Sequence, residues 1–361
     1  MKRLICCFIV CVLFFSVPCK AQATSSYILI EASSGRTLAS ENENVKLPMA
    51  SLTKIMTAYT VIENANLNEI VTITKESAGI EGSSMYIKVG EKYSVEELLY
   101  GLMLVSGNDA ATALAYHIGG SVDGFATLMN EQAKKLQLKN TQFKNPSGLD
   151  AQGHYTTASD LATLTSIALN NAIFSKIVST KQIKIHGKML VNHNRLLREI
   201  DGCIGVKTGY TKACGRCLVS AVKKDDVTLI CVTLNRSNDW AFHKNLYNEN
   251  FKRCKKQLLI SEKEIYRAIK VANGYDVGYY CPSVYGVVID GKTNFSVSIK
   301  VPDFIYHKKV KGDTIGTLLV EDGTNIVAKS DLILDRDTKS IERKKSKIRK
   351  LFDLLLHLFG F

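Results

Sequence analysis

The chain lacks the usual sequence marks of a metalloenzyme. None of its seven histidines belongs to a His-Glu-x-x-His motif, and it has a single Cys-x-x-Cys pair, Cys214 and Cys217. One such pair without a second is weak support for a zinc site, and this one lacks the strand-to-helix context of a redox motif. We therefore expect no metal and no cofactor. The two cysteines remain open between buried thiols and a disulfide on a β-hairpin.

The chain starts with an apolar run, Leu4 to Val17, that is short for a membrane span. Lys2 and Arg3 precede it, and Ala21-Gln22-Ala23 follows as a small-x-small cleavage pattern. These features predict a signal peptide over residues 1–23; the alternative is an uncleaved anchor. In both cases the remainder is exported. Six cysteines lie in that remainder: Cys203, Cys214, Cys217, Cys231, Cys254 and Cys281.

The positive charge is concentrated at one end of the chain. The net charge is +13, and it is +10 without the three basic residues of the export segment. Residues 338–361 carry seven Lys or Arg and two acidic residues. Their net charge of +5 is half of the +10 that remains. A nucleic-acid binder would spread its basic residues over a face of the fold. The distribution instead indicates an anionic surface that meets the tail, and no nucleic acid.

The tail, residues 336–361, has the pattern of an amphipathic helix. At about 100° per residue, its polar face holds Ser346, Arg349, Lys350, Asp353 and His357, and its apolar face holds Ile348, Leu351, Phe352, Leu355 and Phe359. This pattern is typical of a helix that lies in the membrane interface. The alternative is a terminal helix that packs on its own protein.

Between these ends the pattern changes once. Residues 24–262 begin with a hairpin around Ser33-Ser34-Gly35 and continue with helices at about 51–64, 108–118, 121–136 and 159–170. Between the first two of these helices, Ser94-x-x-Glu97 predicts a capping box that opens a further helix with the apolar run 98–106. β-branched runs follow, and a last helix is expected over about 239–257. Strands near both ends with helices between them predict an α+β domain around an antiparallel sheet. Residues 263–335 predict a small all-β domain with Asp-Gly and Gly-Lys turns.

Two Ser-x-x-Lys motifs occur, at Ser51–Lys54 and at Ser220–Lys223. The second lies in a predicted strand, where positions i and i+3 point to opposite sides. The first lies on a predicted helix, where such positions are neighbours. A serine hydroxyl needs a base within hydrogen-bond reach, and a lysine serves when burial or nearby cations lower its pKa. The helix N-terminus favours negative charge near Ser51.

Two further motifs follow in order. Ser106-Gly107-Asn108 links two predicted helices, and Lys207-Thr208-Gly209 lies on a predicted strand. With the Ser51 motif, the set resembles the signature of the penicillin-binding proteins and β-lactamases. The chain is most similar to the low-molecular-mass D-alanyl-D-alanine carboxypeptidases. The likeness includes the stretches at 82–91, 143–162, 205–211, 239–246 and 311–323.

The resemblance implies roles for eight residues. Ser51 matches the acylated nucleophile and Lys54 its base. Ser106 would pass a proton to the leaving amine, and Asn108 would bind the peptide backbone. The substrate-binding residues would be Lys207 and Thr208 at the terminal carboxylate, Gly209 where the strand approaches the substrate, and Tyr210, whose N–H would complete an oxyanion hole with that of Ser51.

The resemblance implies a carboxypeptidase acting on peptidoglycan stem peptides at the outer face of the cytoplasmic membrane, with β-lactams as inhibitors. Its fold would be a β-lactamase/transpeptidase-like domain, then the small β domain and the tail helix.

The Glu-x-x-Leu-Asn pattern of class A β-lactamases is missing, which favours stable acylation over hydrolysis of β-lactams. A β-lactamase and a non-catalytic wall-binding protein remain as rivals, and endopeptidase or transpeptidase activity stays open. His154 and Asp160 border the implied site and are interpreted as loop and helix-cap residues.

Overall fold

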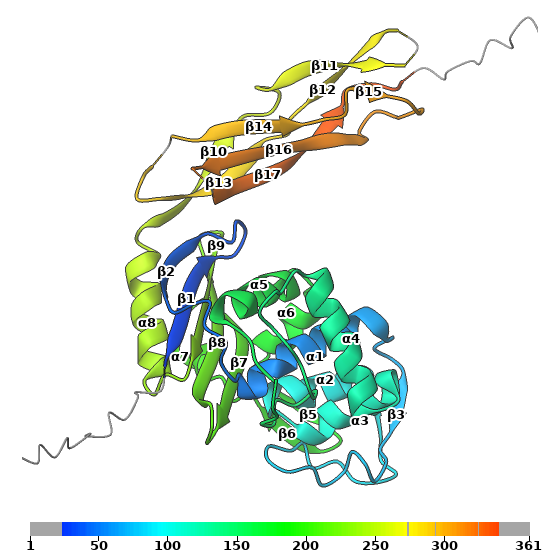
Figure 1. Cartoon of the computed structure of the whole chain (residues 1–361), viewed down its shortest axis with the longest axis vertical. Helices are drawn as coiled ribbons and strands as arrows, with labels where there is room; N and C mark the ends of the chain where they lie inside the picture. Colours follow the sequence, from blue (N-terminus) through cyan, green and yellow to red (C-terminus); the bar gives the residue numbers. More distant parts are fainter. Residues whose placement is uncertain (1–23, 273, 293, 324, 339–361) are drawn as a thin grey trace, which may run out of the picture.

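The computed structural model describes residues 24–338 apart from residues 273, 293 and 324. It has a mixed helix-and-sheet unit and a separate all-β unit, which Figure 1 shows one above the other. This confirms the α+β expectation and the all-β region after it. The predicted signal peptide, 1–23, and nearly all of the predicted tail helix, 336–361, lie outside the described residues.

A five-stranded antiparallel sheet forms the centre of the first unit. Its order is β2 (Thr37–Glu41), β1 (Ser26–Glu31), β9 (Val227–Leu234), β8 (Gly215–Lys224) and β7 (Cys203–Thr211). The two ends of the unit's sequence therefore meet in one sheet, because β1 pairs with β9. Strand β7 is an edge strand, so one side of it remains free of sheet pairing.

Helices cover both faces of this sheet (Figure 1). Helix α8 (Asp239–Asn250) packs on β8 and β9 from one side, and α5 (Ala158–Leu169) and α6 (Ala172–Ser179) pack on the other. The remaining helices are α1 (Lys54–Asn64), α2 (Val95–Leu104), α3 (Asn108–Gly119), α4 (Val122–Lys135) and the short α7 (Leu196–Glu199). Two small hairpins complete the unit: β3 (Ile70–Thr72) with β4 (Lys92–Ser94), and β5 (Gln182–Ile185) with β6 (Lys188–Val191).

Local signals set several element ends. Ser94 and Glu97 form a reciprocal capping box at the start of α2, which confirms that prediction. The helix expected from Ser51 begins instead as a 3-10 turn, η1 (Ala50–Thr53), and becomes α-helical at Lys54. In 3-10 geometry the side chains at i and i+3 eclipse each other. The turn thus places the Ser51 and Lys54 side chains over one another.

The expectation of a helix over 239–257 is wrong beyond Asn250. Residues 254–260 form β10 (Cys254–Ile260), which pairs with β13 (Val284–Ile289). Strand β10 is stabilised by its pairing with β13. The pattern of apolar residues within 239–257 cannot reveal a partner that lies further along the chain. The predicted boundary between residues 262 and 263 falls after β10, although β10 pairs within the second unit.

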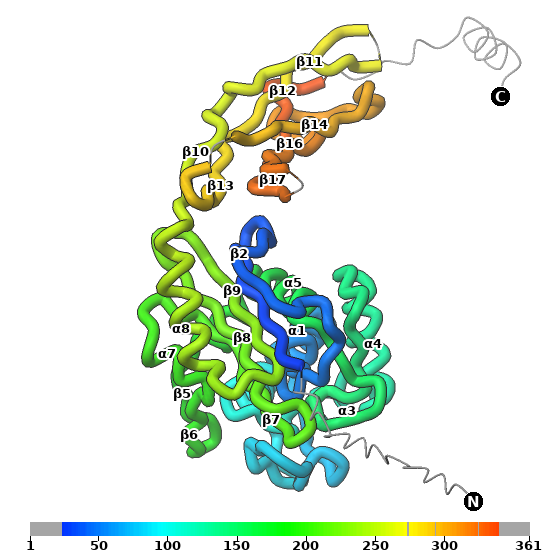
Figure 2. The backbone as a smooth tube through the Cα atoms, turned by 60° about the vertical axis from the view of Figure 1, so that its left-hand side comes forward, coloured from blue at the N-terminus to red at the C-terminus, as the bar shows by residue number. Residues whose placement is uncertain are grey.

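The second unit also has a six-stranded sheet. Its order is β14 (Ser296–Lys300), β16 (Thr314–Asp322), β17 (Asn325–Leu334), β12 (Asp276–Tyr280), β11 (Tyr266–Val271) and β15 (Phe304–Ile305). Figure 2 shows the chain passing from α8 directly into β10. Arg36, in the turn between β1 and β2, donates a hydrogen bond to the backbone oxygen of Val287 and lies 3.9 Å from Asp322. The two units therefore also meet away from the connecting segment.

Within the described part of the chain, no single helix is long and apolar enough to cross a membrane. Only α5 and α6 taken together reach that length and composition, and they are bent by 106° at their junction.

Candidate active site

Ser51 and Lys54 are in direct contact. Lys54 Nζ lies 3.1 Å from Ser51 Oγ, 2.7 Å from the Asn108 side-chain oxygen and 2.6 Å from the backbone oxygen of Ser147. The Lys54 side chain is fully buried. An amine that has two carbonyl acceptors and one hydroxyl as neighbours is positioned to exchange a proton with that hydroxyl.

Burial lowers the pKa of Lys54 well below its ordinary value, and the positive charge of Lys207 adds to the effect. The carboxylate of Asp109 acts in the opposite direction. Burial and a nearby positive charge are the two effects that favour the neutral form of a lysine. The cationic state of Lys54 is thus disfavoured at the position where a base is needed.

Ser106 and Asn108 lie beside this pair at the start of α3. Ser106 is buried and has a positive φ of 62°. Its Oγ has no hydrogen-bond partner among the described residues. The Asn108 side chain accepts from Lys54 and donates to the backbone oxygen of Glu81 at 2.6 Å. Asn108 therefore links Lys54 to the loop that contains Glu81 and holds the amine in place.

The edge strand β7 carries the third motif. Gly209 packs against the turn that carries Ser51: a Cβ on Gly209 would lie 3.2 Å from the backbone oxygen of Met49 and 3.3 Å from the backbone nitrogen of Ser51. The close approach of this strand to substrate stays a prediction; in the structure, the side of Gly209 where a Cβ would stand faces the turn that carries Ser51. A larger residue at position 209 would push strand β7 and the Ser51 turn apart.

Lys207 is buried, and its Nζ donates to the backbone oxygen of Thr208 at 3.0 Å. Burial lowers the pKa of Lys207 to about 7. Tyr210, the last residue of the predicted set, projects its ring outward, with 66% of its surface exposed. All eight predicted residues thus lie around one turn, one helix start and one strand edge.

A cleft of about 320 Å³ opens over Ser51. Its predicted members are Ser51, Ser106, Thr208, Gly209 and Tyr210, and its other members are Ser83, His193, Arg216, Cys217, Asp239 and Trp240. A larger hollow of about 590 Å³ lies between the end of α4 and residues 137–142. That hollow contains none of the predicted residues, so the chemistry assigns the site to the smaller cleft.

Arg216 is the cleft residue that the sequence reasoning missed most clearly. Its guanidinium makes a forked contact with Asp239, with N···O distances of 3.0–3.2 Å. It also lies over the ring of Trp240, 5.7 Å from the centroid. The 239–246 stretch was part of the resemblance, but no role was attached to it. The strand-to-helix contact that assembles this group is not visible in sequence.

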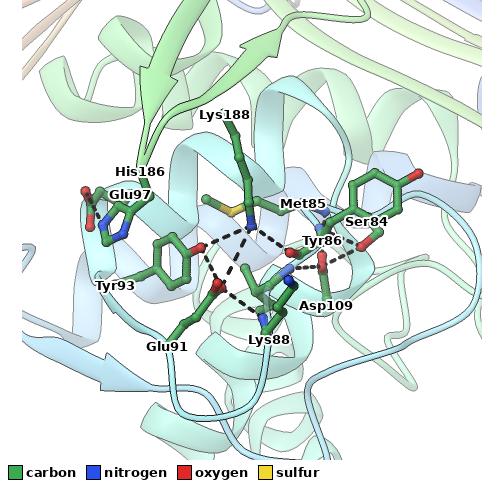
Figure 3. Close-up of polar contacts among 11 residues, drawn as sticks. Ser84, Met85, Tyr86, Lys88, Glu91, Tyr93, Glu97, Asp109, His186 and Lys188 are labelled. Carbon is green, nitrogen blue, oxygen red and sulfur yellow. Dashed lines mark hydrogen bonds and ion pairs between the residues drawn. The ribbon is translucent and has the colours of Figure 1, made fainter.

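The loop of residues 82–91 forms another wall, and Figure 3 shows how it is held. The buried carboxylate of Asp109 accepts from Ser84 Oγ at 2.6 Å, from the Met85 N–H at 2.9 Å and from the Ile87 N–H at 3.2 Å. From the β5–β6 hairpin, Lys188 Nζ donates to the backbone oxygen of Tyr86 at 2.7 Å. Asp109 thus anchors this loop directly beside Asn108.

His154 makes structural contacts, as interpreted. Its Nδ1 accepts from the Lys144 N–H at 3.0 Å, so its Nε2–H donates to Thr53 Oγ1 at 2.7 Å. Burial lowers the pKa of His154 to about 4. Asp160 accepts from the backbone N–H of Asn140 and from the Thr141 hydroxyl near the start of α5.

The second Ser-x-x-Lys motif is correctly set aside. Ser220 is buried on β8 against His243, with 2.7 Å between Oγ and Nδ1, whereas Lys223 is exposed. Among the described residues, no group of three or more His, Cys, Asp or Glu side chains is arranged to hold a metal ion.

Comparison with known proteins gives the same family as the resemblance. The family model for D-alanyl-D-alanine carboxypeptidases matches residues 15–238. The D-alanyl-D-alanine carboxypeptidase DacF of Bacillus subtilis is 31% identical over 337 residues, covering 88% of this chain and 87% of the relative. DacC of Escherichia coli is 37% identical over 227 residues, covering 59% of this chain and 57% of the relative.

Solved structures agree with this match. Penicillin-binding protein 5 of Haemophilus influenzae is 26% identical, with a TM-score of 0.72 over 86% of this chain and 96% of that protein. Both units of the fold are therefore shared with a solved relative.

Proposed function

This chain belongs to the D-alanyl-D-alanine carboxypeptidase family of serine-type hydrolases, and on that premise we propose that it removes the terminal D-alanine of peptidoglycan stem pentapeptides through an acyl-enzyme on Ser51. The observation that carries the proposal is the Ser51–Lys54 contact, with a buried amine whose cationic form is disfavoured.

The three neighbours of Lys54 support a neutral amine as the base. The Asn108 and Ser147 oxygens can only accept, so they take the two hydrogens of a neutral amine. The nitrogen lone pair then faces the Ser51 hydroxyl, which donates to it. As Ser51 Oγ attacks the scissile carbonyl carbon, its proton passes to Lys54.

Collapse of the tetrahedral intermediate requires a proton on the leaving D-alanine nitrogen. Ser106 is suited to relay it, because its hydroxyl lines the cleft without another partner among the described residues. The backbone N–H groups of Ser51 and Tyr210 are the proposed donors to the oxyanion. Water then attacks the ester in the same way and releases Ser51.

Recognition of a free terminal carboxylate is assigned to the β7 side of the cleft. Thr208 offers a hydroxyl there, and buried Lys207 supplies a positive field from behind. Arg216 adds a second cation on the exposed side, partly neutralised by Asp239. A carboxylate is the natural ligand for such a set.

The same attack on the strained amide of a β-lactam gives a penicilloyl ester on Ser51. We propose that this ester is long-lived, because the chain has no Glu-x-x-Leu-Asn pattern to position a hydrolytic water.

The test is incubation with a synthetic pentapeptide that ends in D-alanyl-D-alanine, with D-alanine release followed over time. Release by the parent and none by Ser51→Ala would support the proposal. A parent that forms no D-alanine but hydrolyses a chromogenic cephalosporin would replace it with a β-lactamase. Transfer of the acyl group to an added D-amino acid would reveal transpeptidation.

We further propose that the protein is exported and held at the outer face of the cytoplasmic membrane by residues 336–361. The support is the sequence pattern alone: an apolar stripe behind a run of Lys and Arg. Each basic residue near an anionic surface contributes about 1 kcal/mol, and salt screens this part. Co-sedimentation with anionic and neutral vesicles, with and without residues 338–361, tests it. If the truncated protein still sediments, the tail is not the anchor.

A further inference from the structure

The Cys214–Cys217 pair has no part in the chemistry described so far. Both thiols are buried, with 2% and 1% of their surfaces exposed, and their sulfurs lie 3.6 Å apart. That is contact distance for two unbonded thiols, and a bond requires an approach to about 2.05 Å. A small movement of one turn is enough to close that gap.

The hairpin between β7 and β8 brings the two thiols together. Residues i and i+3 of a regular strand would point to opposite faces of the sheet. Cys214 instead precedes the strand, and Gly215 takes a left-handed conformation, with φ of 67°, that turns the chain back. The Cys214 N–H donates to Thr211 Oγ1 at 3.1 Å, which fixes the turn. Both sulfurs therefore lie on the buried side of one hairpin.

This hairpin is also a wall of the candidate active site. Cys217 lines the same cleft as Ser51 and pairs across the ladder with Gly209. Gly209 in turn has no spare room against the Ser51 turn. Its neighbour Tyr210 pairs with Arg216. A displacement of Cys217 is thus passed to the strand that packs on the nucleophile.

We propose that Cys214 and Cys217 are a redox modification site: they form a reversible disulfide on reaction with a two-electron oxidant such as hydrogen peroxide, and this bond slows acylation at Ser51. The disulfide itself does not depend on the proposed function, whereas its effect on acylation does.

The chemistry balances in two steps. The Cys214 thiolate attacks one peroxide oxygen, the O–O bond breaks, and the released hydroxide takes a proton to leave as water. The Cys217 thiol then attacks the resulting sulfenic sulfur, an S–S bond forms, and a second water leaves. Two thiols lose two electrons and two protons in total, and one peroxide becomes two waters. A dithiol reductant returns both.

The environment assigns Cys214 as the first nucleophile. A hydrogen bond from the Cys217 thiol lowers the pKa of Cys214, with the Thr211 hydroxyl acting in the same sense. The same contact raises the pKa of Cys217. Thiolate character at one sulfur with a protonated thiol beside it is the arrangement of a reactive and a resolving cysteine. Of the two cysteines, Cys217 lines the cleft that a small oxidant can enter, and the Cys214 sulfur lies 3.6 Å from the Cys217 sulfur.

The experiment uses the purified full chain, reduced and then exposed to hydrogen peroxide, with free thiols alkylated afterwards. Trypsin cleaves after Lys212 and Arg216, so Cys214 and Cys217 fall on different peptides. A disulfide is recognised as these two peptides linked, and as two fewer alkylated thiols per chain. We expect the link to form and to disappear after treatment with a dithiol.

Acylation is followed in parallel with a fluorescent penicillin. We expect oxidation to slow labelling of the parent by about 3- to 100-fold, the range that a displacement of up to about 1 Å produces, and dithiol to restore it. Cys214→Ser and Cys214→Ala should each label at the reduced parent's rate and be insensitive to peroxide. Cys254→Ser, a half-buried thiol outside the cleft, is the matched control and should behave as the parent.

The outcomes separate the two claims. Unlinked peptides after peroxide treatment, or a single overoxidised cysteine, overturn the disulfide. A disulfide that leaves the labelling rate unchanged overturns the coupling to the active site. A reduced parent that never labels contradicts the proposed function instead, and leaves the peptide measurement to decide on the disulfide.

Discussion

Replacing Lys54 by Met would test the base most directly. Methionine keeps an unbranched side chain of similar length in the fully buried position but removes the amine. The variant loses the contact to Ser51 and leaves the Asn108 and Ser147 oxygens without their donor. Each unsatisfied acceptor costs about 1–3 kcal/mol of folding stability, so thermal unfolding must be measured beside the kinetics.

The expected loss in the rate of acylation is larger than the loss that partial destabilisation of the fold would cause. A positioned general base contributes about 10²- to 10⁴-fold, which corresponds to about 3–5 kcal/mol of activation free energy. The assay is the second-order rate of labelling by a fluorescent penicillin, at a temperature where both proteins are folded. Lys75→Met, at a lysine whose side chain is 87% exposed, is the matched control and should label at the parent's rate.

The pH profile gives an independent readout of the same base. Because burial and Lys207 lower the pKa of Lys54, the neutral amine should predominate well below the ordinary lysine value of 10.5. Labelling should therefore decline as falling pH protonates Lys54, and decline again as rising pH passes about 7, where Lys207 loses the positive charge that attracts the carboxylate. The reasoning is refuted if Lys54→Met labels within a few-fold of the parent, or if the parent's rate keeps rising up to pH 10.5.

Further predictions concern the other parts of the site. Ser51→Ala should gain no mass on exposure to benzylpenicillin, and an adduct on this variant would move the nucleophile elsewhere. Lys207→Ala should lose more activity on free-acid than on amidated substrate analogues, because a positive charge attracts a carboxylate; equal losses would remove that role. Asp109→Asn should lower the free energy of unfolding by about 1–3 kcal/mol and slow acylation, since the charged anchor of the 82–91 loop beside Asn108 is lost. Unchanged stability and acylation would show that this loop is held by other contacts. As pH falls from 6.5 to about 4, His154 should contribute a loss of folding stability, because it is held neutral only in the folded state. Buried His243 adds to the loss down to about pH 3. His154→Gln, whose side chain does not titrate, should show a shallower decline in denaturant unfolding.

Much of the architecture follows from local patterns. The hairpin at β1 and β2, the capping box of α2 and the helices α3, α4 and α5 lie where the residues predicted them. These signals are short in range: a turn needs its own glycine, and a cap needs a residue three positions away. The contact between Ser51 and Lys54 also follows from sequence, because residues three apart at the start of a helix are neighbours.

Tertiary structure alone decided what surrounds that pair. The helix expected up to residue 257 stops at Asn250 because β10 finds β13 as a partner. Lys207 is buried behind the cleft, while Arg216, Asp239 and Trp240 come from a strand and a helix to line it. The Cys214 and Cys217 sulfurs meet because of one left-handed glycine. Each of these outcomes depends on how distant segments pack or on a single backbone torsion. Neither cause produces a periodic pattern of apolar residues that could be recognised in the sequence. The sequence therefore determines that Ser51 and Lys54 are neighbours, and the packing determines which charged groups and thiols surround them.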